Sequence, residues 1–331
     1  MKNSTLSGAD MPLNRCQAGP DVRAAGEYLY TLRRDGTAAL IRYRGDEADV
    51  TVPARLDGFP VTGIREDAFR GRQKMKSLRL PEGIRNIGKW AFSFCFALTQ
   101  VELPESLEGI GQYLFYACDS LQTVRLPSGL RNIGKGAFQG CRELRGVTLP
   151  ESLRIIWDQA FRDCISLAEI RLPKTVTRIG KEAFFRCGCL DYVALPDGLT
   201  EIGEKAFCDC INLTGIDLPK SVLHIGKRAF SRCGELKSVT LPEGLAEIEK
   251  ETFYSCRFLS SARLPQSLTS IGTRAFYHCG LKKVALPGSL TRIGKDAFAR
   301  NFHPMMLLSP GSSYAEKYCR ENGLNYLHIA D

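Results

Sequence analysis

The sequence contains no run of about 20 uncharged apolar residues, the length that a membrane-spanning helix requires, so we predict no membrane insertion. Its first residues, MKNSTLSGADMPLNRCQAGP, hold one lysine and no continuous apolar segment. They do not resemble a secretory signal peptide, and this start predicts a cytoplasmic protein. The net charge of +9 over 331 residues is mild and indicates no particular partner.

Catalytic motifs are also lacking. The sequence has neither a G-x-S-x-G elbow nor an H-E-x-x-H helix, and its four histidines lie far apart, at positions 224, 278, 303 and 328. The segment GIRNIGK, residues 83–89, matches the first part of a phosphate-binding loop. However, Trp90 stands where that motif needs a hydroxyl for Mg²⁺. We therefore predict a protein that is not an enzyme and holds no cofactor.

What the sequence has instead is a repeat of 23 residues. The pair Leu-Pro recurs at this interval from Leu80 to Leu264, and a phenylalanine column runs from Phe69 to Phe298. Self-similarity at such a period is typical of stacked supersecondary units, none of which buries its apolar face alone. The sequence therefore predicts a solenoid rather than two or three globular domains.

Each part of one unit has a physical reason. In L-x-x-V-x-L, the last two apolar residues alternate as a short strand requires. The proline that follows lacks an N–H group and ends the strand pairing. Gly111 is expected to relax a turn by adopting positive φ. The spacing of Ala91, Phe92 and Cys95 predicts a one-turn helix with these residues on one side.

Nine of the 13 cysteines occupy one position of the repeat, at residues 95, 118, 141, 164, 187, 210, 233, 256 and 279. We interpret them as a column of small buried thiols, because coils about 4.8 Å apart place side chains too far apart for disulfides, whose Cβ atoms prefer about 3.8 Å. A metal or redox ladder is the alternative, with C-x-C pairs at Cys187 and Cys208 as possible zinc ligands. Because the repeat itself generates these pairs, we predict no metal site.

The pattern L-x-x-V-x-L-P-x-x-L-x-x-I-G-x-x-A-F-x-x-C resembles the BspA-like class of leucine-rich repeats and covers residues 52–301. The resemblance implies an α/β repeat solenoid, a right-handed superhelix with a parallel β-sheet on one face and short helical turns opposite. It also implies a role in protein recognition or adhesion. Many relatives are exported surface proteins, so the resemblance suggests a cell-surface or secreted protein where the first residues suggest a cytoplasmic one.

Four parts of the chain are expected. Residues 1–26 are predicted to be a flexible tail, and 27–51 a hairpin cap with its turn at Asp35-Gly36. Residues 52–301 form the solenoid of about 11 repeats. Residues 302–331 form a helix and strand cap, with a capping box at Ser313 and Glu316 and a helix C-cap at Gly323.

The predicted sheet face is the surface to which every coil contributes outward side chains, so it is the candidate surface for a protein partner. Arginine and tyrosine are common interface anchors. The candidate binding residues are Arg125, Arg171, Tyr192, Glu169 and Asp217. The simpler interpretation is a solvated sheet with cross-strand charge pairs.

A lysine column after the glycine offers an alternative function, the binding of polyanions such as glycans or nucleic acid. Its candidate residues are Lys89, Lys135, Lys181 and Lys227. Asp158 and Glu204 interrupt this ridge, and no aromatic residues alternate with it as single-strand binding requires. We therefore favour a protein partner over nucleic acid, and we expect a monomer.

Overall fold

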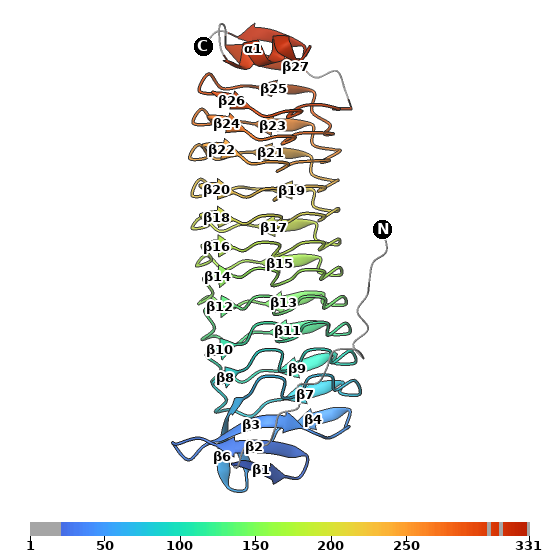
Figure 1. Ribbon diagram of the computed structural model, residues 1–331, viewed down its shortest axis with the longest axis vertical. Coiled ribbons are helices and arrows are strands. Elements are labelled where there is room, and N and C mark those ends of the chain that lie inside the picture. Colours follow the sequence, from blue (N-terminus) through green and yellow to red (C-terminus); the bar gives the residue numbers. More distant parts are fainter. Residues whose placement is uncertain (1–20, 303–305, 311–313, 330–331) are drawn as a thin grey trace.

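The computed structural model describes residues 21–302, 306–310 and 314–329. The chain forms an elongated stack of coils between an N-terminal hairpin and a C-terminal helix (Figure 1). Two ladders of short parallel strands run along the stack. This arrangement confirms the predicted repeat solenoid with a parallel sheet on one face. The right-handed winding stays a prediction.

The first ladder, the sheet face, joins residues 23 apart in register, so that Val124 lies beside Val147. In most of its strands a buried middle residue stands between two exposed ones, the alternation that a sheet with one face on the core requires. Its strands are β4 (Asp49–Thr51), β7 (Ser77–Arg79), β9 (Gln100–Glu102), β11 (Thr123–Arg125), β13 (Gly146–Thr148), β15 (Glu169–Arg171), β17 (Tyr192–Ala194), β19 (Gly215–Ile216), β21 (Ser238–Thr240), β23 (Ser261–Arg263), β25 (Lys283–Ala285) and β27 (Met306–Pro310).

The second ladder is called here the isoleucine ladder, because every strand in it ends on an isoleucine. It lies beside the sheet face and joins the same coils (Figure 1). Its strands are β6 (Phe59–Ile64), β8 (Asn86–Ile87), β10 (Gly109–Ile110), β12 (Asn132–Ile133), β14 (Ile155–Ile156), β16 (Arg178–Ile179), β18 (Glu201–Ile202), β20 (His224–Ile225), β22 (Glu247–Ile248), β24 (Ser270–Ile271) and β26 (Arg292–Ile293).

Both ladders are interrupted. The sheet face loses strand pairing between β9 and β11, between β13 and β15, and between β19 and β21. The isoleucine ladder loses it between β10 and β12 and between β20 and β22. At these points neighbouring coils still stack through their other contacts, but the backbone ladder does not hold them together.

The predicted helical turns are wrong for the described residues, since the segment around Phe92 consists of hydrogen-bonded turns. Each such segment holds two residues with positive φ, as at Trp90 (φ 56°) and Phe94 (φ 59°). Left-handed residues four positions apart are incompatible with a right-handed helix. Every second N–H group there bonds to the next coil instead, as Phe92 N–H does to the Leu114 carbonyl at 3.1 Å.

The glycines that follow the isoleucine in the repeat, such as Gly88, Gly111 and Gly203, are called here the glycine column. Their role differs from the one predicted. Gly111 does not have positive φ. A Cβ atom at Gly111 would lie 2.4 Å from the carbonyl carbon of Gly88 in the preceding coil, and one at Gly203 would lie 2.6 Å from the backbone of Gly180. Glycine fits this column because consecutive backbones nearly touch. Trp157 occupies the same column, and β14 still pairs with β12 and β16 there. Where Glu249 replaces it, the ladder is interrupted between β20 and β22.

Eleven buried phenylalanines form a continuous spine through the stack, from Phe69 to Phe298. Neighbouring rings from Phe138 onward are nearly parallel, and their centroids lie 5.2–5.5 Å apart. Stacking of identical side chains at the coil spacing gives each coil an apolar contact with both neighbours. The spine therefore transmits packing along the whole solenoid.

The cysteine column is buried beside this spine, as predicted. Each thiol donates a hydrogen bond to the phenylalanine carbonyl of the preceding coil, as Cys118 Sγ does to Phe92 O at 3.0 Å. All described cysteines are free. Burial raises the pKa of the column thiols from Cys118 to Cys279, to about 12 for Cys279. The column is thus a set of inert packing residues, because only the thiolate is reactive.

This packing makes a testable prediction. A thiol-reactive probe should label Cys189 in the native protein, because it is exposed, and leave the nine column cysteines unlabelled until the protein unfolds. The sequence alone suggests labelling of Cys16, Cys208 and Cys319 too, and Cys16 lies outside the described residues. Cys208 and Cys319 are buried, and burial raises the pKa of their thiols to about 12 and about 11, respectively. Peptide mapping by mass spectrometry, with Cys189→Ser as control, measures each site. Rapid labelling of the column would contradict the packing role.

The N-terminal end is built differently from the predicted tail and cap. Strand β1 (Val22–Ala25) falls inside the predicted tail of 1–26 and pairs antiparallel with β2 (Tyr28–Leu32). Strand β2 continues through a turn at Asp35-Gly36 into β3 (Ala38–Tyr43), and β5 (Arg55–Leu56) pairs with β6. Strand β4, within the predicted cap of 27–51, instead begins the sheet face by pairing with β7. Residues 1–20 lie outside the described residues.

The C-terminal end consists of β27, helix α1 (Tyr314–Glu321) and β28 (Tyr326–Ile329). Strand β27 continues the sheet face beside β25, and β28 pairs with β27. Gly323 ends the helix with φ 63°, as its predicted role requires. The proposed capping box cannot be assessed, because Ser313 lies outside the described residues.

Candidate functional site: a hollow in the sheet face

A hollow of about 540 Å³ lies on the sheet face where β13 and β15 are not paired. Its volume falls within the roughly 300–1,000 Å³ of small binding sites. It spans three coils, and β11, β13 and β15 form its floor and walls. The lining residues are Thr123, Val124, Arg125, Gly146, Val147, Thr148, Leu149, Glu151, Glu169, Ile170, Arg171, Leu172 and Pro173.

The hollow exists because one coil lacks a side chain on this face. Gly146 occupies the column of Thr123 and Glu169, and a Cβ atom placed on it would meet nothing within 4 Å. Beside it, Val147 is only partly buried, whereas Val124 and Ile170 in the same column are buried. The floor of the hollow therefore exposes part of the apolar core.

Charged side chains surround this floor. Arg125 makes a long ion pair of 3.5 Å with Glu105, in which both side chains are largely exposed. The side chains of Glu169 and Arg171 are exposed and make no hydrogen bond or ion pair with another described residue. Charges that the fold does not use internally remain available for a ligand. An apolar floor with a charged rim is the usual composition of a recognition site.

Tyr192 and Asp217 extend the same surface toward the C-terminal end. The Tyr192 hydroxyl donates a hydrogen bond to Asp217 Oδ2 at 3.2 Å, and this bond raises the pKa of the tyrosine. Tyr192 is 47% exposed. The hydrogen bond holds the aromatic side chain in place and leaves its face open to solvent.

Three of the five residues predicted from the sequence lie together around one hollow: Arg125, Glu169 and Arg171. Tyr192 lies on β17, which pairs with β15 in the sheet face. Sequence reasoning missed Gly146 and Val147, which create the hollow, and Glu151 at its rim. One signal was present: Gly146 and Gly215 are the two glycines in a column that otherwise holds residues with side chains. The loss of pairing between β13 and β15 has no such signal.

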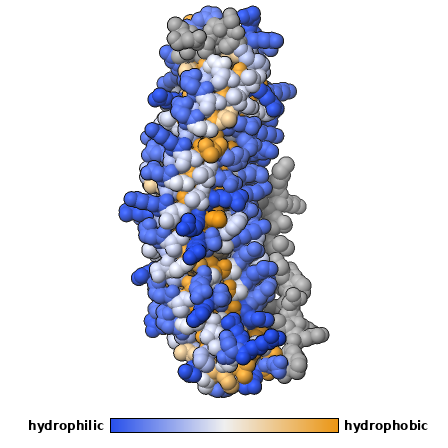
Figure 2. Space-filling view, turned by 90° about the vertical axis from the view of Figure 1, so that its left-hand side faces the viewer, coloured by the Kyte–Doolittle hydropathy of each residue, from blue (hydrophilic) through white to orange (hydrophobic). Residues whose placement is uncertain are grey.

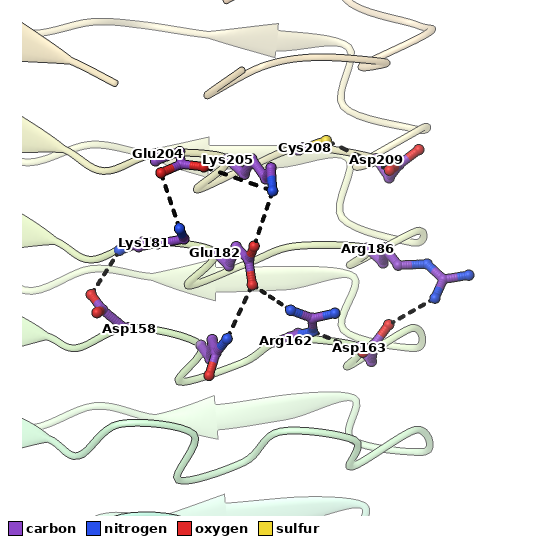
Figure 3. A network of polar contacts seen from close by, with 11 residues as sticks. Asp158, Arg162, Asp163, Lys181, Glu182, Arg186, Glu204, Lys205, Cys208 and Asp209 are labelled. Atoms are coloured by element: carbon purple, nitrogen blue, oxygen red, sulfur yellow. Dashed lines mark hydrogen bonds and ion pairs between the residues drawn. The ribbon is translucent and has the colours of Figure 1, made fainter. Parts of the chain in front are cut away.

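The lysine ridge is less uniform than its sequence suggests. Lys89, Lys135 and Lys227 are exposed, and their ammonium groups have no partner among the described residues. Lys181 instead forms an ion pair of 3.0 Å with Glu204, which raises the pKa of the lysine (Figure 3). One of the four lysines is therefore neutralised by a neighbouring coil.

Acidic side chains pair with further basic side chains on this side of the solenoid. The Glu182 carboxylate accepts hydrogen bonds from Gln159, Arg162 and Lys205 (Figure 3). Burial opposes ionisation of Glu182. The Gln159 hydrogen bond and the two basic side chains outweigh burial, so the pKa of this carboxyl lies below its usual value. These contacts tie three coils together, and they leave a discontinuous basic surface.

Neither a metal site nor a membrane span is found in the described part of the chain. No group of three or more His, Cys, Asp or Glu there is placed to hold a metal ion. None of the helical structure described is long and apolar enough to cross a bilayer. His224 and His278 lie on different coils and share no position of the repeat. Nothing in these ranges points to catalysis.

The stacked 23-residue coils, the two parallel ladders and the apolar spine define a solenoid of the leucine-rich-repeat class. The chain belongs to the BspA-type leucine-rich repeat family, whose six-copy region model matches residues 62–191 and 177–303. Proteins of this kind often act in surface recognition and are generally not enzymes. No curated protein matches the chain.

Solved structures of bacterial leucine-rich repeat proteins have the same fold. A leucine-rich cell surface protein of Faecalibacterium prausnitzii is 25% identical, with a TM-score of 0.53 over 91% of this chain and 97% of its own. A leucine-rich repeat protein of Bacteroides ovatus is 24% identical, with a TM-score of 0.60 over 93% and 100%. The pneumococcal vaccine antigen PcpA is 17% identical, with a TM-score of 0.60 over 94% and 99%.

Proposed function

We propose that this protein is a non-enzymatic recognition or adhesion protein that binds a protein partner through its sheet face. The hollow between β13 and β15 is the centre of the contact. The observation that carries the proposal is the exposed apolar floor at Val147 beside the unpaired charges of Glu169 and Arg171. A partner that covers the floor and pairs these charges gains both apolar burial and charge-assisted hydrogen bonds.

The size of the surface also favours a protein. Strands about 4.8 Å apart extend the sheet face well beyond the hollow, so a partner can contact several coils at once. Arg125, Arg171 and Tyr192 lie near its middle and are of the residue types that anchor interfaces. The Faecalibacterium relative is described as a cell surface protein, and we propose the same location for this one.

The test compares two triple variants with a partner first identified by pull-down. Replacing Arg125, Arg171 and Tyr192 by alanine should weaken binding at least about tenfold in biolayer interferometry, because each replacement removes an anchor. None of the three is a core residue, so circular dichroism should be unchanged. Replacing Lys135, Lys181 and Lys227 should have a much smaller effect.

The opposite result would contradict the proposal. If the lysine variant abolishes binding while the sheet-face variant does not, the recognition surface is the lysine ridge. A steep loss of affinity with added salt would then identify a polyanion as the ligand, because its binding releases counterions.

A further inference from the structure

A second hollow, of about 490 Å³, opens on the isoleucine ladder where β10 and β12 are not paired. It is formed by different residues from the sheet-face hollow and lies on the side of the molecule seen in Figure 2, where small apolar patches interrupt a hydrophilic surface. Its lining residues are Glu108, Gly109, Ile110, Gly129, Leu130, Arg131, Asn132, Gly134 and Trp157.

Two departures from the repeat produce this hollow. Gly109 stands where the neighbouring coils have Asn86 and Asn132, so the middle of the site lacks a side chain. Trp157 stands in the glycine column, where a Cβ atom faces the preceding coil. The coil therefore carries a large side chain where its neighbours have none, and Trp157 is 38% exposed.

The floor of the hollow is apolar. Ile110 is only partly buried, whereas the corresponding Ile87 and Ile133 are 3% and 0% exposed. The indole of Trp157 forms a wall, and the Arg178 guanidinium lies 5.5 Å from the centroid of its ring. A floor and a wall of this kind exclude water from one flat side of a ligand.

The rim is polar and electrically balanced. Glu108, Arg131 and Asn132 are exposed and make no side-chain hydrogen bond or ion pair with any other described residue. One carboxylate and one guanidinium give no net charge, so the rim does not select an ion. Together with the Asn132 amide, they offer both donors and acceptors on planar groups.

We propose that this hollow binds an uncharged sugar ring of a glycan. A pyranose has an apolar C–H face that packs on an indole, and hydroxyl groups at its edge that both donate and accept hydrogen bonds. The floor, wall and rim match these two properties. Strand addition by a peptide is disfavoured, because β10 and β12 are two residues long and offer too short an edge.

The chain has only two tryptophans, which gives the test a local signal. In a Trp90→Phe background, Trp157 is the only tryptophan. An array of neutral and acidic glycans identifies candidates, which are then titrated as soluble trisaccharides while the Trp157 emission is followed. We expect saturable binding of at least one neutral glycan, with a change in emission.

Two substitutions test the site without disturbing the fold. Trp157→Gly restores the residue of the repeat column, and Gly109→Asn fills the hollow with the residue that flanking coils use. Each should weaken binding at least about tenfold, as measured by calorimetry in the otherwise native chain, while circular dichroism stays unchanged. The sheet-face variant should bind the glycan normally, which separates this proposal from the proposed protein partner.

Three results would overturn the proposal. The first is that no glycan of the array binds saturably. The second is that a neutral glycan binds but neither substitution weakens it. The third is that only acidic glycans bind. If acidic glycans bind and the lysine variant loses this binding, the glycan site is the lysine ridge.

Discussion

Replacing Phe184 by alanine should lower the free energy of unfolding by about 3–5 kcal/mol, the usual cost of removing a buried aromatic side chain. The ring is fully buried, and its centroid lies 5.3 Å from that of Phe161 and 5.2 Å from that of Phe207. The substitution leaves a cavity that faces two coil interfaces at once. Denaturant unfolding measures the change, and hydrogen exchange should show lost protection in the coils on both sides.

Phe258 provides the matched control, because it is the same residue type but 59% exposed. Its replacement by alanine should change stability by less than about 0.5 kcal/mol. Equal effects at the two positions would contradict the view that the spine holds the stack together. So would a loss of protection spread evenly over all coils, since contacts in a solenoid reach only neighbouring repeats.

Replacing Gly203 by alanine should destabilise the protein by about 1–3 kcal/mol, the usual cost of overpacking. The added Cβ atom would lie 2.6 Å from the backbone of Gly180 and Lys181, and backbone atoms cannot rotate away as a side chain can. The coils must separate instead. The hydrogen bond from Gly203 N–H to the Ile179 carbonyl, 2.8 Å long, should then weaken and its amide should exchange faster.

Gly215→Ala is the control for this substitution, because a Cβ atom there meets nothing within 4 Å and the residue has no positive φ. We expect it to be neutral within about 0.5 kcal/mol. If Gly203→Ala were equally neutral, the close approach of consecutive coils would not explain the glycine column. Thermal unfolding of the two variants side by side gives the comparison.

The amino-acid sequence by itself determined the solenoid, its period and its core. Columns of Leu, Ile, Phe and Cys recur at 23-residue intervals. They predict a structure in which identical side chains stack on each other from coil to coil. The same periodicity identified the sheet face, because residues such as Arg125 and Arg171 flank inward residues in every strand. Stacking in register converts a position in the repeat directly into a position on the surface.

Only the tertiary structure decided the features that depend on how closely neighbouring coils approach. The turn at Trp90 and Phe94 is not helical, although its apolar spacing fits a helix, because every second N–H group there bonds to the next coil. The glycine column likewise serves contact between coils. The two hollows lie at interruptions of the ladders, where neighbouring strands are not paired. A repeat pattern specifies which residues are equivalent, whereas the distance between equivalent residues depends on the packing of all their neighbours.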